Sequence, residues 1–267
     1  MTDTRSFPAR AAASPDATQY SLTKILGIWA SVTAPMAVLA FVVGPAIIPH
    51  TSLHPGLVHW ILMVIGMAWQ FVVSLLVLRH ELGGLRWQAV KERIRLNVPR
   101  DPRTGRQRRV LLWWAVPAIT ANAVGGILAA RLDTVWTNWL PFLHEPSYTN
   151  IQELADPQFK GQWWIFGLAM TSCVFNYLLG EELLFRGVLL PKMTGVFGRW
   201  DWFANGVLFG LYHVHKIWAW PSMVASGFGV SWAAGRFRSF WMGVIVHGVE
   251  GFFIFLVLAV VLGWYPR

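Results

Sequence analysis

The chain has 267 residues, of which 55% are hydrophobic and only 13% are charged. Soluble domains carry about 25% charged residues, so this composition excludes an ordinary soluble enzyme. The net charge of +9 does not indicate a nucleic-acid partner, because ten of the 22 Lys and Arg residues lie together between residues 79 and 109, between two apolar stretches. A basic loop in that position is typical of the cytoplasmic side of a membrane protein.

Three long apolar stretches follow a polar N-terminus. Residues 1–23 are rich in Ala, Ser, Thr and Pro and are predicted to form a disordered cytoplasmic tail, followed by a transmembrane domain over residues 24–267. Residues 25–48, 57–78 and 110–132 are each long enough, at 1.5 Å per helical residue, to cross a hydrocarbon core of about 30 Å. They predict three membrane-spanning helices.

The second half of the chain contains four further apolar stretches. Residues 163–190 are interrupted near their end by charged side chains, and residues 202–217, 221–237 and 240–264 contain several glycines. We expect residues 202–217 and 221–237 to form short or irregular helices behind the others, where imperfect membrane helices are tolerated. The predicted fold class is all-α, a polytopic transmembrane helix bundle of about seven spans.

The distribution of basic residues predicts the orientation. Residues 79–109 hold ten basic and three acidic side chains, whereas residues 133–160 hold four acidic side chains and one lysine. Because basic loops stay in the cytoplasm, the first is predicted to lie inside, the second outside, and the N-terminus inside. Within the basic loop, Trp87, Val90 and Ile94 have helical spacing, which suits either a short interfacial helix or a solvated loop.

Glu181, Glu182 and Arg186 are unusual because a charge at membrane depth costs several kcal/mol and indicates a partner or a function. Glu182 and Arg186 are four residues apart and can pair along a helix. Adjacent helical residues point about 100° apart, so Glu181 faces another direction without that partner. Glu181 is therefore the predicted acid or base.

Two histidines are predicted to reach the same depth as Glu181. Glu181 lies eleven residues before Lys192, or roughly 16 Å from the cytoplasmic end of its helix. His213 and His247 follow Asp201 and Arg238 by twelve and nine residues. One carboxylate and two imidazoles at a common level can transfer protons or bind a metal.

These residues resemble the motifs of the CPBP family of intramembrane proteases, which includes the type II CAAX prenyl endopeptidases and the bacterial bacteriocin-processing or Abi immunity proteins. The resemblance covers about residues 163–255. It rests on two glutamates followed after three residues by arginine, on Phe209 followed by His213, and on Ser239 followed by His247. Position 251 is Gly where the family usually has Asn, and Glu250 is adjacent to it.

The resemblance implies an intramembrane endopeptidase whose catalytic set is Glu181, Glu182, Arg186, His213 and His247. Glu181 would be the general base that activates water. His213 and His247 would either bind a zinc ion together with Glu181, leaving one position for water, or stabilise the oxyanion without metal. Both versions hydrolyse a peptide bond.

Two other functions are compatible with the sequence. The first is a catalytically inactive family member that acts as a membrane scaffold or immunity protein, which the Gly251 departure favours. The second is a proton-coupled carrier, although the ionisable groups gather at one level instead of crossing the membrane. The expected partners of the leading hypothesis are the lipid bilayer and a hydrophobic peptide that enters from the cytoplasmic side. The Arg-rich, Lys-poor composition favours a bacterial inner membrane.

Overall fold

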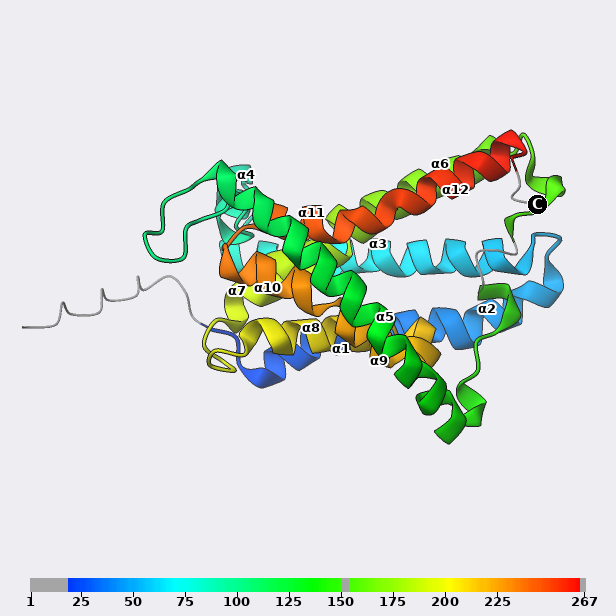
Figure 1. The fold of residues 1–267 in the computed structure, drawn as a ribbon, viewed down its shortest axis with the longest axis horizontal. Helices are drawn as coiled ribbons and strands as arrows, with labels where there is room; N and C mark the ends of the chain where they lie inside the picture. Colours follow the sequence, from blue (N-terminus) through cyan, green and yellow to red (C-terminus); the bar gives the residue numbers. More distant parts are fainter. Residues whose placement is uncertain (1–18, 150–153, 265–267) are drawn as a thin grey trace, which may run out of the picture.

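The computed structural model describes residues 19–149 and 154–264, which form a bundle of helices without a β-strand in these two ranges (Figure 1). Most helices run roughly along the long axis of the molecule. The basic segment with helix α4 (Trp87–Arg93) lies at one end, and α2 (Gly44–Ile47) and the end of α12 (Phe253–Leu262) lie at the other. We call these two ends the basic end and the far end. The predicted all-helical class is confirmed.

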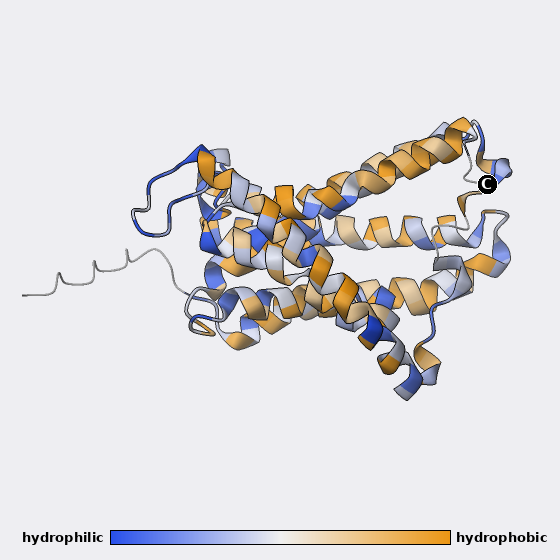
Figure 2. Ribbon diagram, viewed as in Figure 1, coloured by the Kyte–Doolittle hydropathy of each residue, from blue (hydrophilic) through white to orange (hydrophobic). Residues whose placement is uncertain are grey.

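Five helical stretches in the described residues are long and apolar enough to cross a membrane, at Leu22–His50, Pro55–Leu82, Arg109–Trp139, Trp163–Met193 and Phe240–Leu262. They match the long apolar runs predicted from the sequence. The first three extend beyond both predicted ends, the fourth ends at Met193 instead of residue 190, and the fifth ends at Leu262 instead of residue 264. Their large apolar side chains face outward, including Val42, Ile127 and Phe255, which are more than 60% exposed. Figure 2 shows that hydrophobic residues predominate along the helices and that hydrophilic segments lie at the two ends. The chain is therefore an integral membrane protein.

These stretches combine α-helix with π- and 3₁₀-helical segments. The first consists of α1 (Leu22–Val38), η1 (Leu39–Val43), α2 and η2 (Ile48–His50), and the second is α3 (Pro55–Leu82). The third is η3 (Arg109–Trp114) with α5 (Ala115–Trp139). The fourth consists of α6 (Trp163–Val174), η8 (Phe175–Leu179), η9 (Leu183–Leu189) and α7 (Leu190–Met193), and the fifth of α11 (Phe240–Gly248), η11 (Val249–Phe252) and α12.

The two short stretches are irregular, as predicted. They form α8 (Asp201–Tyr212), η10 (Val214–Ala219), α9 (Trp220–Ser226) and α10 (Phe228–Arg236). Helix α8 packs against α9 and α10, and α5 crosses α9 and α10 on another side. With 12, 7 and 9 residues, α8, α9 and α10 are too short to span a membrane as single helices. The five long stretches are therefore confirmed as candidate spans, and the total of seven remains a prediction.

The basic loop contains the helix α4, so the helical interpretation of this segment is the correct one. Ile94 is buried against α3 and η9, while Trp87 is 65% exposed. Arg93 forms an ion pair with Glu81 at 2.8 Å and donates to the carbonyl oxygens of Gly187 and Val188. The helix therefore lies against the bundle and its tryptophan projects outward.

The predicted tail and the predicted outer loop differ from the structure at their edges. Of the tail, residues 1–18 lie outside the described residues. Tyr20 is buried and hydrogen-bonds Glu81, and its burial raises the pKa of this phenol. Ser21 caps α1, which begins at Leu22, so the first helix begins before residue 23. At the outer loop, α5 continues to Trp139, so the irregular segment is shorter than residues 133–160.

Irregular structure does follow α5 at the far end. It contains three 3₁₀ turns, η4 (Pro141–Leu143), η5 (Ser147–Thr149) and η7 (Pro157–Phe159), and residues 150–153 lie outside the described part of the chain. This segment lies beside the start of α3, where Tyr148 contacts His59 at a ring-centroid distance of 5.7 Å. The outer segment therefore packs onto the bundle at the far end.

Candidate active site

Gly180 brings the glutamate pair close to helix α3. A Cβ atom at this position would lie 2.6 Å from the carbonyl oxygen of Phe175 and 2.9 Å from that of Met67. Any larger residue would therefore push the two helices apart. The chain on both sides is π-helical, in η8 and η9, a conformation found frequently at functional sites. The close approach and the widened helix together place Glu181 and Glu182 in the middle of the bundle.

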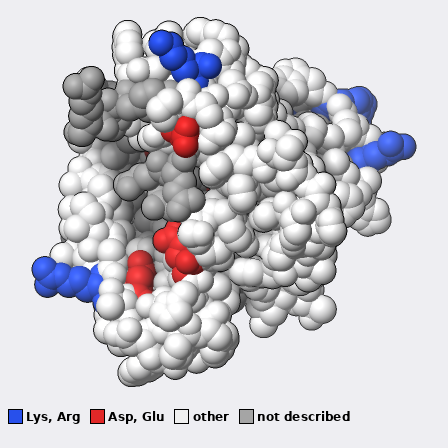
Figure 3. Space-filling view, turned by 90° about the vertical axis from the view of Figure 1, so that its right-hand side faces the viewer, with Lys and Arg blue, Asp and Glu red and all other residues white. Residues whose placement is uncertain are grey.

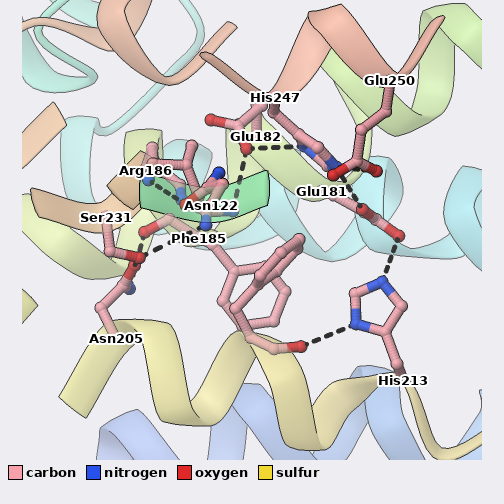
Figure 4. Close-up of polar contacts among 12 residues, drawn as sticks. Asn122, Glu181, Glu182, Phe185, Arg186, Asn205, His213, Ser231, His247 and Glu250 are labelled. Atoms are coloured by element: carbon pink, nitrogen blue, oxygen red, sulfur yellow. Dashed lines mark hydrogen bonds and ion pairs between the residues drawn. The ribbon is translucent and has the colours of Figure 1, made fainter. Parts of the chain in front are cut away.

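Glu181 lies between the two histidines that the sequence predicts at its depth. Its Oε1 is 3.9 Å from Nε2 of His213, and its Oε2 is 3.8 Å from Nε2 of His247 (Figure 4). The residue is 3% exposed. Each carboxylate oxygen thus faces one imidazole nitrogen, at a separation that is too long for a direct hydrogen bond and that suits a bridging water molecule.

The second nitrogen of each imidazole fixes its tautomer. His213 Nδ1 lies 2.9 Å from the carbonyl oxygen of Phe209, which can only accept, so Nδ1 carries the proton. His247 Nδ1 lies 3.0 Å from Oε1 of Glu182, also an acceptor. In the neutral form, both Nε2 atoms therefore present a lone pair toward Glu181. An Nε2 atom can donate to an oxyanion only when its ring is protonated.

Glu182 pairs with Arg186 as predicted, at 2.8 Å in a fully buried position. The oxygen that accepts from Arg186 also faces His247 Nδ1, a contact that the sequence did not reveal. Arg186 continues the network through a 3.3 Å hydrogen bond to Ser231, whose hydroxyl donates to Asn205 at 3.0 Å. These contacts form a buried polar network that ends at His247 (Figure 4).

Phe209 connects the parts of the site. Its ring lies 4.0 Å below the Arg186 guanidinium, its centroid is 4.9 Å from that of His213 and 5.3 Å from that of His247, and its carbonyl accepts from His213. Tyr177 contacts the other edge of His247, with centroids 4.9 Å apart and rings perpendicular. His247 is therefore held between two aromatic rings and the Glu182 carboxylate.

The donor atoms of the site are of the kinds that bind zinc, but the distances between them are longer than those in a zinc site. Zinc-binding histidines usually donate their second N–H to a carbonyl or carboxylate, as His213 and His247 do here. Tetrahedral zinc with bonds of about 2.0–2.1 Å needs donors about 3.4 Å apart, whereas the two pairs stand 3.8 and 3.9 Å apart. Within the described ranges, no three His, Cys, Asp or Glu side chains are grouped to hold a metal ion.

The remaining motif positions have different surroundings. Ser239 lies outside the site, and its hydroxyl donates to the carbonyl oxygen of Asn97 at 2.6 Å. Gly251 lies beside Tyr177, whose ring would be 3.3 Å from a Cβ atom there. The Glu250 side chain is 59% exposed and lies 3.8 Å from His247 Nε2. The position that usually carries Asn therefore leaves room for the Tyr177 ring.

A cavity of about 740 Å³ connects the site with the far end of the bundle. Glu181, His213 and His247 line its inner part, and Glu145 and Tyr148 of the outer segment line it as well. Figure 3, which views the far end, shows a hollow with acidic side chains beside it. We expected a peptide to enter from the cytoplasmic side, whereas the lining of this cavity leads away from the basic segment and toward the far end.

Sequence reasoning missed the polar residues that hold the site together. Asn205 and Ser231 are fully buried in short helices, and Tyr177 lies in a π-helical turn. Asn205 lies eight residues before His213, in the helix that ends directly before this histidine. A polar side chain in an apolar helix that leads to a candidate histidine was the available signal.

These observations define an integral membrane protein with a buried carboxylate–imidazole site at the end of a cavity that both polar and apolar side chains line. The family model described as type II CAAX prenyl endopeptidase Rce1-like matches residues 161–253, about a third of the chain. The match covers all five motif residues and confirms the family resemblance over this segment. No curated protein and no solved structure matches the chain.

Proposed function

We propose that the protein is an intramembrane endopeptidase that hydrolyses a peptide bond of a hydrophobic or membrane-associated peptide in a bacterial inner membrane. The observation that carries this proposal is the position of Glu181, whose two oxygens each face the Nε2 atom of a histidine inside a cavity. This arrangement provides acceptors for both hydrogens of one water molecule. The family match is the supporting evidence that the reaction is proteolysis.

Glu181 is the proposed general base. A water molecule at the centre of the site donates one hydrogen to the Glu181 carboxylate and the other to the Nε2 lone pair of His213, which leaves its oxygen lone pairs free to attack a carbonyl carbon. Attack forms the new C–O bond and transfers the water proton to Glu181. Breakage of the C–N bond then takes that proton to the leaving amine.

His247 is the proposed proton-bearing imidazole. Its Nδ1–H faces Glu182, and its Nε2 faces the reaction centre. A carboxylate that accepts from Nδ1 orients the ring and stabilises the positive charge of an imidazole whose Nε2 has taken a proton from solvent before the water attacks. The protonated Nε2 can donate to the developing oxyanion. In this mechanism Glu182 and Arg186 are positioning residues, because they act through His247.

Glu181→Gln tests this function. The purified protein is incubated in detergent with a mixture of synthetic hydrophobic peptides in H₂¹⁸O, and mass spectrometry detects new C-termini that carry one ¹⁸O atom. Removing a general base reduces rates by about 10²–10⁴-fold, so Glu181→Gln should produce almost no labelled termini. The exposed glutamate of α4 gives the matched control, Glu92→Gln.

The result also separates the protease from a membrane scaffold. A scaffold produces no labelled termini in the wild type or in either variant, while a fluorescent peptide still binds to all three proteins. Equal hydrolysis by the wild type and a folded Glu181→Gln variant contradicts the role of Glu181 directly.

The metal content of the purified protein tests the zinc version of the mechanism. The spacing of the donors predicts no stoichiometric zinc in the wild type. One zinc per chain that disappears in His213→Ala and in His247→Ala would instead establish a metal-dependent hydrolase in which these side chains are ligands.

A further inference from the structure

The described cavity links the reaction site with the far end of the bundle. Its lining runs from Glu181 and His247 to Asp133, which lies in the last two turns of α5, and to Glu145 and Tyr148, which follow α5. These last residues belong to the far end, whereas α4 and the start of α5 lie at the basic end. A substrate that uses this cavity therefore arrives from the far end.

The distribution of basic residues indicates that the far end is the non-cytoplasmic end. Ten of the 22 Lys and Arg residues of the chain lie in residues 79–109 at the basic end, and Lys192, Arg199, Arg236 and Arg238 follow helices that return there. Positive loops remain in the cytoplasm during insertion. The cavity thus opens toward the outer side of the membrane.

The charge of the cavity is opposite to that of the whole chain. Four acidic side chains line it, Asp133, Glu145, Glu181 and Glu250, against one lysine, Lys216. The chain as a whole carries +9. Acidic groups at the wall of a low-dielectric cleft concentrate the field and attract cations. The Glu250 side chain is 59% exposed, so its charge is available to a bound molecule.

The volume of about 740 Å³ lies within the range of about 300–1,000 Å³ that is typical of ligand-binding clefts. Its walls combine these carboxylates with apolar side chains, among them Met36, Met63, Met67 and Phe253. A hydrophobic segment that carries a basic residue would match both kinds of surface.

We infer that the site receives its substrate from the non-cytoplasmic side of the membrane, and that Glu145 and Glu250 select a peptide with a Lys or Arg side chain near the cleaved bond. This inference rests on the proposed endopeptidase function, because the bound peptide is a substrate only if the protein hydrolyses it. The direction of access and the charge preference can both be measured without catalysis, so the two proposals can fail separately.

Cysteine labelling tests the direction of access. Cys173 is the single cysteine of the chain, so Cys173→Ser gives a background into which Glu145→Cys or, as the matched control at the basic end, Arg103→Cys is introduced. Both positions are exposed. A membrane-impermeant maleimide added to intact cells should label Glu145→Cys, and Arg103→Cys only after permeabilisation. The reverse pattern overturns the inference.

Peptide binding tests the charge preference. Two fluorescent hydrophobic peptides, identical except for Lys or Glu at one position, are titrated against detergent-purified Glu181→Gln, which binds without hydrolysis. The Lys peptide should bind at least about tenfold more tightly at low salt, and this ratio should fall several-fold when Glu145→Gln and Glu250→Gln are added. Adding Glu92→Gln instead should leave the ratio unchanged.

Equal affinity for the two peptides, or a ratio that the added substitutions do not change, overturns the charge preference. Salt gives a second criterion, because 1 M salt shortens the Debye length to about 3 Å and should remove most of the difference. The wild type could hydrolyse neither peptide while still preferring the Lys peptide and while Glu145→Cys is labelled in intact cells. In that case the proposed proteolysis is wrong, and the direction of access and the charge preference are supported.

Discussion

The buried Glu182–Arg186 pair should be essential for stability because each charge depends on the other. Both side chains are completely inaccessible to solvent, and their closest atoms are 2.8 Å apart. Arg186→Met removes one charge and keeps a long, largely apolar side chain. Glu182 is then a buried carboxylate whose remaining described hydrogen-bond partner is the imidazole of His247.

The expected magnitude follows from measured cases of this kind. Removing one partner of a buried ion pair costs about 3–5 kcal/mol, whereas replacing both partners by apolar residues is often neutral. For chains of 150–250 residues each kcal/mol corresponds to roughly 2–4 °C in the unfolding midpoint. Arg186→Met should therefore lower the midpoint by about 6–20 °C, and the double variant Glu182→Met with Arg186→Met should recover most of that loss.

Circular dichroism during heating in one detergent at one scan rate measures these midpoints. Arg103→Met is the matched control, because it makes the same change at an exposed position of the basic loop. Unfolding of Arg186→Met at the same temperature as this control would contradict the dependence of each buried charge on the other. The same dependence is refuted if the double variant is less stable than Arg186→Met, because the two charges would then not compensate each other.

Two further substitutions separate packing from chemistry. A Cβ atom at Gly243 would collide with Oε2 of Glu182, so Gly243→Ala should lower the unfolding midpoint by several degrees. At Gly248 nothing lies within 4 Å of a Cβ atom, so Gly248→Ala should change the midpoint little. Equal midpoints of the two variants would contradict the described packing. Ser239→Ala removes a hydrogen bond to the Asn97 carbonyl and should cost about 1 kcal/mol with peptide hydrolysis retained. Loss of hydrolysis at an unchanged midpoint would place this serine in the reaction instead.

The convergence of Glu181, His213 and His247 could be predicted because membrane helices constrain depth. A constant rise per residue converts distance along the sequence into distance from the membrane surface, and cytoplasmic charges provide the starting points. Helix geometry also predicted the Glu182–Arg186 pair, because residues four apart meet on one face of a helix. These predictions required no knowledge of how the helices pack.

The remaining features depend on packing and could not be predicted in that way. The π-helical turns beside the glutamates accompany the close approach of Gly180 to the Met67 carbonyl on α3, a contact between residues more than 100 positions apart. The direction of the cavity depends on where the segment after α5 folds back, which its polar, irregular sequence leaves open. Depth along each helix therefore predicted which residues meet, and packing decided from which end they can be reached.

The two adjacent glutamates of one helix point into two different environments. Consecutive side chains diverge by about 100°, so Glu182 points into a closed network of Arg186, Ser231 and Asn205 while Glu181 points into the cavity. His247 touches both, with Nδ1 toward the closed side and Nε2 toward the open side. Changes in the closed network can therefore alter the reaction by turning or recharging one imidazole, without any change in the path by which a peptide enters.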